Sequence, residues 1–158
     1  MKEAVLRDFF AGMASAEQLA RDVRGAIKRV SAVESYQLIE DMDTQWTVTR
    51  PMLVALCDAI LEHKLTPDSL HQIGFALIAS DHFEWEDDLI ASVVSDWSCP
   101  EINYALTSEN VARFRKWLLE EEPYPPKPGI DEVNWDKQRT ISRLEKRRKK
   151  PWLRNPFR

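Results

Sequence analysis

Hydrophobic residues recur along this chain at the three- and four-residue spacing of amphipathic helices. The first expected helix covers 2–11 and ends at Gly12, because glycine is common just past a helix C-terminus. A second helix begins at a capping box, in which the Ser15 hydroxyl and the Gln18 amide satisfy exposed backbone N–H groups. Its expected apolar stripe consists of Leu19, Val23, Ile27 and Val30.

Three later helices are expected to start at a shared signature. Thr49, Thr66 and Thr107 each follow an apolar residue, and another apolar residue stands four positions later. This arrangement predicts an N-cap threonine with a hydrophobic staple around it. The expected later helices cover 50–63, 67–80, 85–97 and 108–121, and a short helix is expected around 35–40 before a loop. Core positions of the later helices include Trp85, Trp97 and Trp117.

These elements predict an all-α fold, a single compact bundle of about six helices with a proline-rich arm and a basic C-terminal tail. The helical domain is expected at 1–122, the arm at 123–136 and the tail at 137–158. Short connections favour antiparallel neighbouring helices. The composition agrees, because 44% of the residues are hydrophobic and only four are glycine.

Charge divides the chain at Lys137. Residues 1–136 contain 12 Lys and Arg against 25 Asp and Glu, a net charge of −13. Residues 137–158 contain ten basic residues against Glu145 alone, a net charge of +9. Clustered charge of this kind attracts oppositely charged partners, so binding rather than catalysis is the expected role.

The densest acidic cluster lies at 81–88 and is the expected surface for a protein partner. Its candidate contact residues are Asp81, Glu84, Trp85, Glu86, Asp87 and Asp88, with Asp41 and Asp43 as additions. Such a surface can dock a basic protein or imitate the phosphates of nucleic acid. The alternative interpretation is local, because acids in the first turn of a helix complement its dipole, and Asp81 or Glu84 can cap the helix at 85–97. Both interpretations can hold together.

The basic tail has three interpretations. Its candidate binding residues are Lys146, Arg147, Arg148, Lys149, Lys150 and Trp152. They can bind a phosphate backbone while Trp152 stacks on a base. They can instead contact anionic lipid, with Trp152, Leu153 and Phe157 at the interface. The third interpretation is a solvated chain end attracted to its own acidic body.

No familiar catalytic, metal or cofactor motif occurs. The three histidines, His63, His71 and His82, lack the spacing of zinc ligands, and His63 is expected in the last turn of its helix. Cys57 lies on an apolar stripe, where burial makes a thiol inert. We therefore expect no enzyme, no cofactor and no metal. The alternative of an unfamiliar active site would involve His71, His82 and Glu84.

The segment from Leu6 to Ala20, LRDFFAGMASAEQLA, resembles the start of small bacterial immunity-type proteins of the colicin-immunity-like group. In that group an aromatic-rich first helix is followed by a glycine and a Ser-Ala-Glu cap. The resemblance implies a helical protein that binds and neutralises a toxin domain, and an acidic body suits a basic toxin. Cytoplasmic location and no membrane span are expected, because no signal peptide and no run of roughly 20 apolar residues occurs. A nucleic-acid-associated protein acting through the tail is the alternative function.

Overall fold

The computed structural model describes residues 1–29 and 35–125. Met1–Tyr124 form one compact unit and Pro125–Arg158 are grouped as a second. The expected six helices are present among the described residues. Their bounds are α1 Glu3–Phe10, α2 Ala16–Ala26, α3 Arg50–Leu61, α4 Pro67–Ala79, α5 Asp88–Ser98 and α6 Ser108–Leu118. No helix in the described part of the chain is long and apolar enough to cross a membrane.

The predicted N-cap residues stand at the starts of four helices, and the side chains of two of them, Ser15 and Thr107, accept the capping hydrogen bond. Ser15 and Gln18 form the capping box of α2, with the Gln18 N–H donating to Ser15 Oγ at 3.2 Å and the Ser15 N–H donating to Gln18 Oε1 at 2.7 Å. Thr49, Thr66 and Thr107 are the N-cap residues of α3, α4 and α6. The signatures in the sequence therefore mark real helix starts.

The prediction of an all-α fold is wrong, because four short strands form two small sheets. The strands are β1 Ile27–Arg29, β2 Ser35–Gln37, β3 Trp46–Val48 and β4 Phe83–Trp85. The first two pair antiparallel, and β3 and β4 pair parallel. Each strand is three residues long, so hydrophobic periodicity over a longer window conceals it. The fold is mostly helical with mixed content.

The first sheet overturns two helical predictions. Helix α2 ends at Ala26, and Ile27 begins β1 with 42% of its surface exposed instead of lying on a helical core stripe. The helix predicted at 35–40 is replaced by β2, since the Leu38 N–H donates to the Ala26 carbonyl at 2.9 Å. A further bridge joins Lys2 to Glu40. Backbone N–H and C=O groups that were expected to bond within a helix therefore bond to residues distant in sequence.

The second sheet shortens α5. This helix begins at Asp88, and Trp85 belongs to β4 instead of a helical core stripe. Neither Asp81 nor Glu84 caps α5. The cap is Asp87, whose Oδ1 accepts the Ile90 N–H at 3.0 Å. The N-cap residue Asp87 has an extended backbone, so the chain passes from β4 into α5 through a short extended segment.

Two helices end at a left-handed residue that is not glycine. Gly12 follows α1 at φ 72°, as expected, but His63 after α3 and Glu120 after α6 take the same left-handed conformation at 60° and 58°. The prediction that His63 lies in the last helical turn is therefore wrong. The His63 N–H bonds to the Ile60 carbonyl at 2.9 Å, and the Lys64 N–H bonds to the Ala59 carbonyl at 2.8 Å. These two bonds close a Schellman turn.

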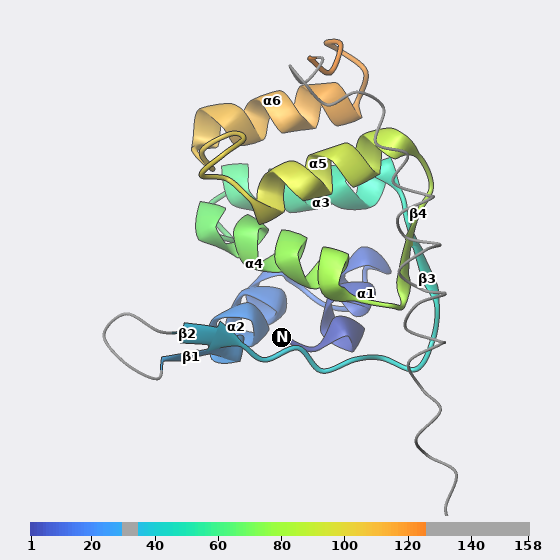
Figure 1. Ribbon diagram of the computed structural model, residues 1–158, viewed down its shortest axis with the longest axis vertical. Coiled ribbons are helices and arrows are strands. Elements are labelled where there is room, and N and C mark those ends of the chain that lie inside the picture. The colour runs from blue at the N-terminus through green and yellow to red at the C-terminus, as the bar shows by residue number, and fades with distance from the viewer. Residues whose placement is uncertain (30–34, 126–158) are drawn as a thin grey trace, which may run out of the picture. The chain divides into compact units, whose positions relative to one another are not determined.

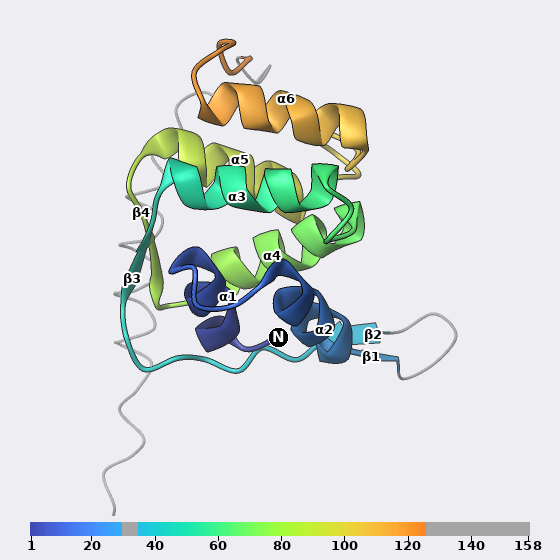
Figure 2. The ribbon, with the colours of Figure 1, turned by 180° about the vertical axis from the view of Figure 1, so that it is seen from behind.

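The helices of Met1–Tyr124 lie in successive tiers (Figures 1 and 2). Helix α6 packs on α3, α4 packs on α5, and α2 packs on both α1 and α4. The largest fully buried side chains include Trp97, Phe83 and Phe114, and Trp97 meets Phe114 edge to face with ring centroids 6.0 Å apart. The β3–β4 sheet is anchored in this apolar core through Val48 and Phe83. At the end of the unit the Tyr124 hydroxyl donates to the buried carboxylate of Asp96.

Candidate functional site

The parallel pairing of β3 and β4 joins two acidic segments that are far apart in sequence. Trp46 is in register with Phe83, and Val48 with Trp85. The Trp46 N–H donates to the His82 carbonyl at 2.8 Å, and the Glu86 N–H donates to the Val48 carbonyl at 3.1 Å. These bonds place the residues before β3 beside the start of the 81–88 segment.

Glu3 contacts both the segment before β3 and the start of the 81–88 segment through its buried side chain. Its side chain is fully buried, and its Oε2 accepts the Met42 N–H at 2.9 Å. The same oxygen lies 3.4 Å from His82 Nδ1. Because Met42 stands between Asp41 and Asp43, this carboxylate holds both aspartates near His82 and Asp81. Sequence analysis missed this role, since a glutamate in a first helical turn ordinarily serves the helix dipole.

The structure brings together most of the predicted contact residues on one side of the unit. Six exposed carboxylate residues lie on the segments that β3 and β4 join, and we call them the acidic edge: Asp41, Asp43, Asp81, Glu84, Glu86 and Asp88. Figure 1 shows β3 and β4 on the opposite side of this unit from the β1–β2 hairpin. The two additions proposed from the sequence therefore belong to the same surface as the main acidic cluster.

Asp87 is held differently from the acidic edge. It is only partly exposed, and its Oδ2 accepts from Arg50 Nε at 2.6 Å while Oδ1 caps α5. Arg50 also pairs with Glu120, and hydrogen bonds to Glu120 and Asp87 raise the pKa of its guanidinium group. Asp87 therefore has a structural role in α5, whatever further role it has in binding.

Two partly buried tryptophans accompany the acidic edge. Trp85 on β4 and Trp46 on β3 each pack against the core and keep part of their surface accessible. Aromatic side chains of this kind often anchor protein interfaces, whereas exposed carboxylates mainly steer the approach of a partner. The predicted contact residue Trp85 therefore lies where aromatic anchoring and electrostatic attraction can act on the same partner.

The other candidates from the sequence are the residues of the alternative active site, Cys57 and the tail. His71 is exposed on α4, and Glu84 is exposed on β4. Within residues 1–29 and 35–125, no group of three or more His, Cys, Asp and Glu side chains is arranged to hold a metal ion. Cys57 is a buried free thiol, and burial raises its pKa, as expected for an unreactive group. The predicted tail residues Lys146, Arg147, Arg148, Lys149, Lys150 and Trp152 lie outside the described residues.

Comparison of the chain with known protein families, with curated proteins and with solved structures finds no match. The functional argument therefore depends on the site alone.

Proposed function

We propose that this chain is a non-enzymatic protein-binding module that docks a basic protein domain through the acidic edge. The observation that carries the proposal is the β3–β4 pairing, which gathers carboxylates from two separate segments on one surface beside Trp46 and Trp85. A cation-rich partner would meet several carboxylates at once, and long-range attraction would speed its approach. The partner we propose is a toxin domain, which an immunity-type protein would neutralise.

The pattern of ion pairs supports this choice of surface. Lys and Arg side chains near α3 and α6 are already neutralised, with Arg115 Nε 2.6 Å from Asp58 and Lys116 Nζ 2.7 Å from Glu122. Beside the acidic edge, Arg50 is shared between Asp87 and Glu120. Arg50 is therefore engaged by Asp87 and Glu120, and a partner's cations would meet the solvent-exposed carboxylates of the acidic edge.

The test uses the full chain and two variants with equal charge change. The first is Asp43→Lys/Glu86→Lys, which reverses two exposed carboxylates of the acidic edge. The control is Glu101→Lys/Glu121→Lys, which reverses two exposed carboxylates outside it. Each protein is used to capture partners from nuclease-treated lysate of its own cells, and the captured protein is then titrated by calorimetry.

We expect the acidic-edge variant to bind the captured protein at least about tenfold more weakly, because charge pairs across interfaces contribute more than 1.4 kcal/mol in favourable cases. The control should bind almost as tightly as the unchanged chain. Equal weakening by both variants would mean that only net charge matters and would remove the acidic edge as the contact surface. The toxin assignment is tested separately, by expressing the captured protein in cells with and without this chain.

A nucleic-acid-associated role through the basic tail is the second candidate. The observation in its favour is the composition of 137–158, with ten basic residues against one acidic residue. Replacing Lys146, Arg147, Arg148, Lys149 and Lys150 with glutamine in the full chain should abolish nucleic-acid retention. Binding by the unchanged chain should fall steeply as salt is raised, because counterion release drives such contacts. Retention that is insensitive to salt would contradict this role.

A further inference from the structure

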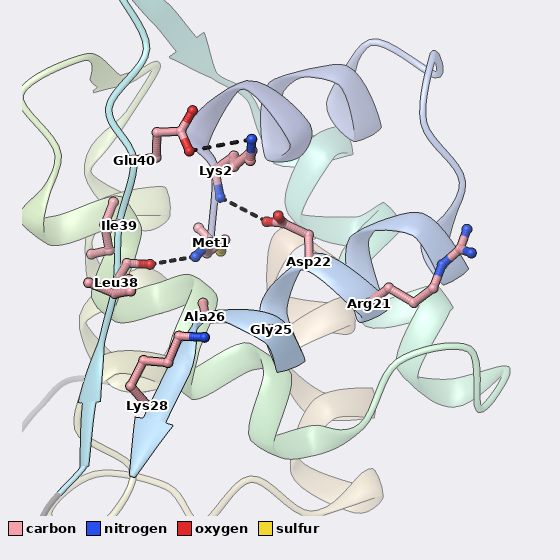
Figure 3. Close-up of a pocket in the computed structure, with 10 residues that line it drawn as sticks. All are labelled: Met1, Lys2, Arg21, Asp22, Gly25, Ala26, Lys28, Leu38, Ile39 and Glu40. Atoms are coloured by element: carbon pink, nitrogen blue, oxygen red, sulfur yellow. Dashed lines mark hydrogen bonds and ion pairs between the residues drawn. The ribbon is translucent and has the colours of Figure 1, made fainter. Parts of the chain in front are cut away.

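A surface pocket of about 540 Å³ lies between α2, the first residues of the chain and the segment that follows β2. Figure 3 shows Lys28, Leu38 and Ile39 on one side of it and Asp22 and Gly25 of α2 on the other. Its volume falls within the roughly 300–1,000 Å³ of small-molecule sites. The β1–β2 sheet beside this pocket lies on the opposite side of the unit from β3 and β4 in Figure 1, although pocket residue Glu40 directly precedes Asp41 of the acidic edge.

Lys28 of this pocket has no ion pair with another described residue. Six Lys and Arg residues outside the pocket each have a carboxylate within 4.0 Å: Arg7, Arg50, Lys64, Arg113, Arg115 and Lys116. Lys28 has no carboxylate within that distance among the described residues, although Met1–Tyr124 contain 22 Asp and Glu, and the same holds for Arg21 and Arg24. Lys28 therefore belongs to the minority of cations in this acidic unit that have no described carboxylate beside them.

The two acidic residues of the pocket are already engaged. Asp22 Oδ2 accepts the backbone N–H of Lys2 at 2.8 Å, and Glu40 Oε2 lies 3.4 Å from Lys2 Nζ. Figure 3 shows both of these contacts, and it shows the guanidinium group of Arg21 pointing away from the pocket. Among the described residues, the ammonium group of Lys28 therefore lines the pocket without a carboxylate beside it, next to the N-terminal ammonium group of Met1, which donates to the Leu38 carbonyl.

The same pocket contains apolar surface and unfilled space. Leu38 keeps 49% of its surface exposed, and Ile39 and Ala26 line the wall beside it. A Cβ atom added to Gly25 would meet nothing within 4 Å, so this position of α2 leaves the space open. Covering exposed Leu38 with an apolar group would be favourable, because apolar surface would leave water.

We propose that this pocket binds small amphipathic anions, with the anionic head at Lys28 and the apolar body against Leu38 and Ile39. Three separate observations meet here: a cation with no carboxylate within 4.0 Å among the described residues, an exposed apolar wall and an open position at Gly25. An apolar pocket with a few convergent polar groups is the usual form of a small-molecule site. The proposal does not depend on the acidic edge or on any protein partner.

The first experiment titrates the full chain with octanoate while its backbone N–H signals are followed by NMR. Octylammonium carries the same apolar body with the opposite charge, and acetate carries the same head without the body. We expect octanoate to shift the Gly25 and Leu38 signals to saturation, and the other two probes to leave them unchanged at matched concentration. Equal shifts with octylammonium would overturn the anionic specificity, and no saturable shift with octanoate would overturn the site.

Three variants then test the geometry. Lys28→Gln should weaken octanoate binding about tenfold, because hydrogen bonds to charged groups are the stronger ones. Gly25→Gln should abolish binding by filling the open space, while its melting temperature stays at or above that of the unchanged chain. Lys116→Gln removes a cation on α6 and should bind octanoate normally. Unchanged binding by both Lys28→Gln and Gly25→Gln would place the ligand elsewhere.

Discussion

The acidic edge and the pocket at Lys28 each lie beside a pair of three-residue strands but differ in the sign of the charge that they present. At the acidic edge the nearby cation, Arg50, is held by Asp87 and Glu120, and the carboxylates of the edge are exposed to solvent. At the pocket Asp22 and Glu40 are held by Lys2, and Lys28 has no carboxylate within 4.0 Å among the described residues.

This difference shows that net charge alone does not define what a surface can bind. Met1–Tyr124 contain 22 acidic and 11 basic residues, so a calculation from composition would assign one acidic surface to the whole unit. Instead, exposed carboxylates gather at the acidic edge, while the ammonium group of Lys28 lines the pocket. The two regions are therefore expected to select partners of opposite sign, and changes in their supporting residues should affect them separately.

The largest expected effect comes from the residue that anchors the acidic edge. Phe83 of β4 is fully buried and meets Phe10 edge to face, with ring centroids 6.5 Å apart. Phe83→Ala should lower the free energy of unfolding by about 3–5 kcal/mol, because it removes buried contacts and leaves a cavity. The measurement is urea unfolding of the full chain.

The matched change on the pocket side is Leu38→Ala. Because Leu38 is half exposed, its loss should cost less than about 1 kcal/mol, well below the cost at Phe83. If Phe83→Ala and Leu38→Ala lowered the free energy of unfolding by similar amounts, the core would support both regions equally. That result would contradict the difference between the acidic edge and the pocket.

A loss between those at Phe83 and Leu38 is expected at Gly74, where α4 closely approaches α5. A Cβ atom at Gly74 would lie 2.9 Å from Trp97 Cβ and 3.0 Å from the Ser98 backbone nitrogen. Gly74→Ala should therefore cost about 1–2 kcal/mol, since overpacking outweighs the gain in helix propensity. Thermal unfolding measures this effect, and a stabilised Gly74→Ala would contradict the close packing of these helices.

The structural role of Asp87 can be measured by comparing its substitution with that of its exposed neighbour Glu86. Asp87→Ala removes the cap of α5 and the ion pair with Arg50, and it should cost about 1–2 kcal/mol. Glu86→Ala changes an exposed neighbour and should stay within about 0.5 kcal/mol of the unchanged chain. Urea unfolding of both variants decides this, and equal values would remove the structural role assigned to Asp87.

The helices could be predicted because their starts are encoded locally. Ser15, Thr49, Thr66 and Thr107 mark four helix starts that the structure confirms. The strands could not, since a three-residue strand is stabilised by its partner, and the partner of Trp46 is Phe83, far along the chain. Two helix ends were also misplaced, because His63 and Glu120 take a backbone conformation that usually favours glycine.

The candidate surface could be predicted only in part. Composition located the acidic segment at 81–88 and the additions Asp41 and Asp43, because clustered charge is visible in the sequence. The β3–β4 pairing and the buried Glu3 that join them were not visible, since both depend on contacts between distant residues. The pocket at Lys28 was missed for the same reason, because its walls come from three separate parts of the chain.

A gain in stability is expected from one alanine substitution, on the pocket side of the comparison. Gly25 lies near the end of α2, and a Cβ atom there would meet nothing within 4 Å. Gly25→Ala should raise the free energy of unfolding by about 0.4–1 kcal/mol, because alanine restricts the unfolded chain without strain in the helix. The measurement is thermal unfolding of Gly25→Ala in parallel with Gly74→Ala, which is expected to lower stability instead of raising it. If Gly25→Ala were destabilising, the space beside Gly25 would not be open, and the site proposed for amphipathic anions would lose its geometric basis.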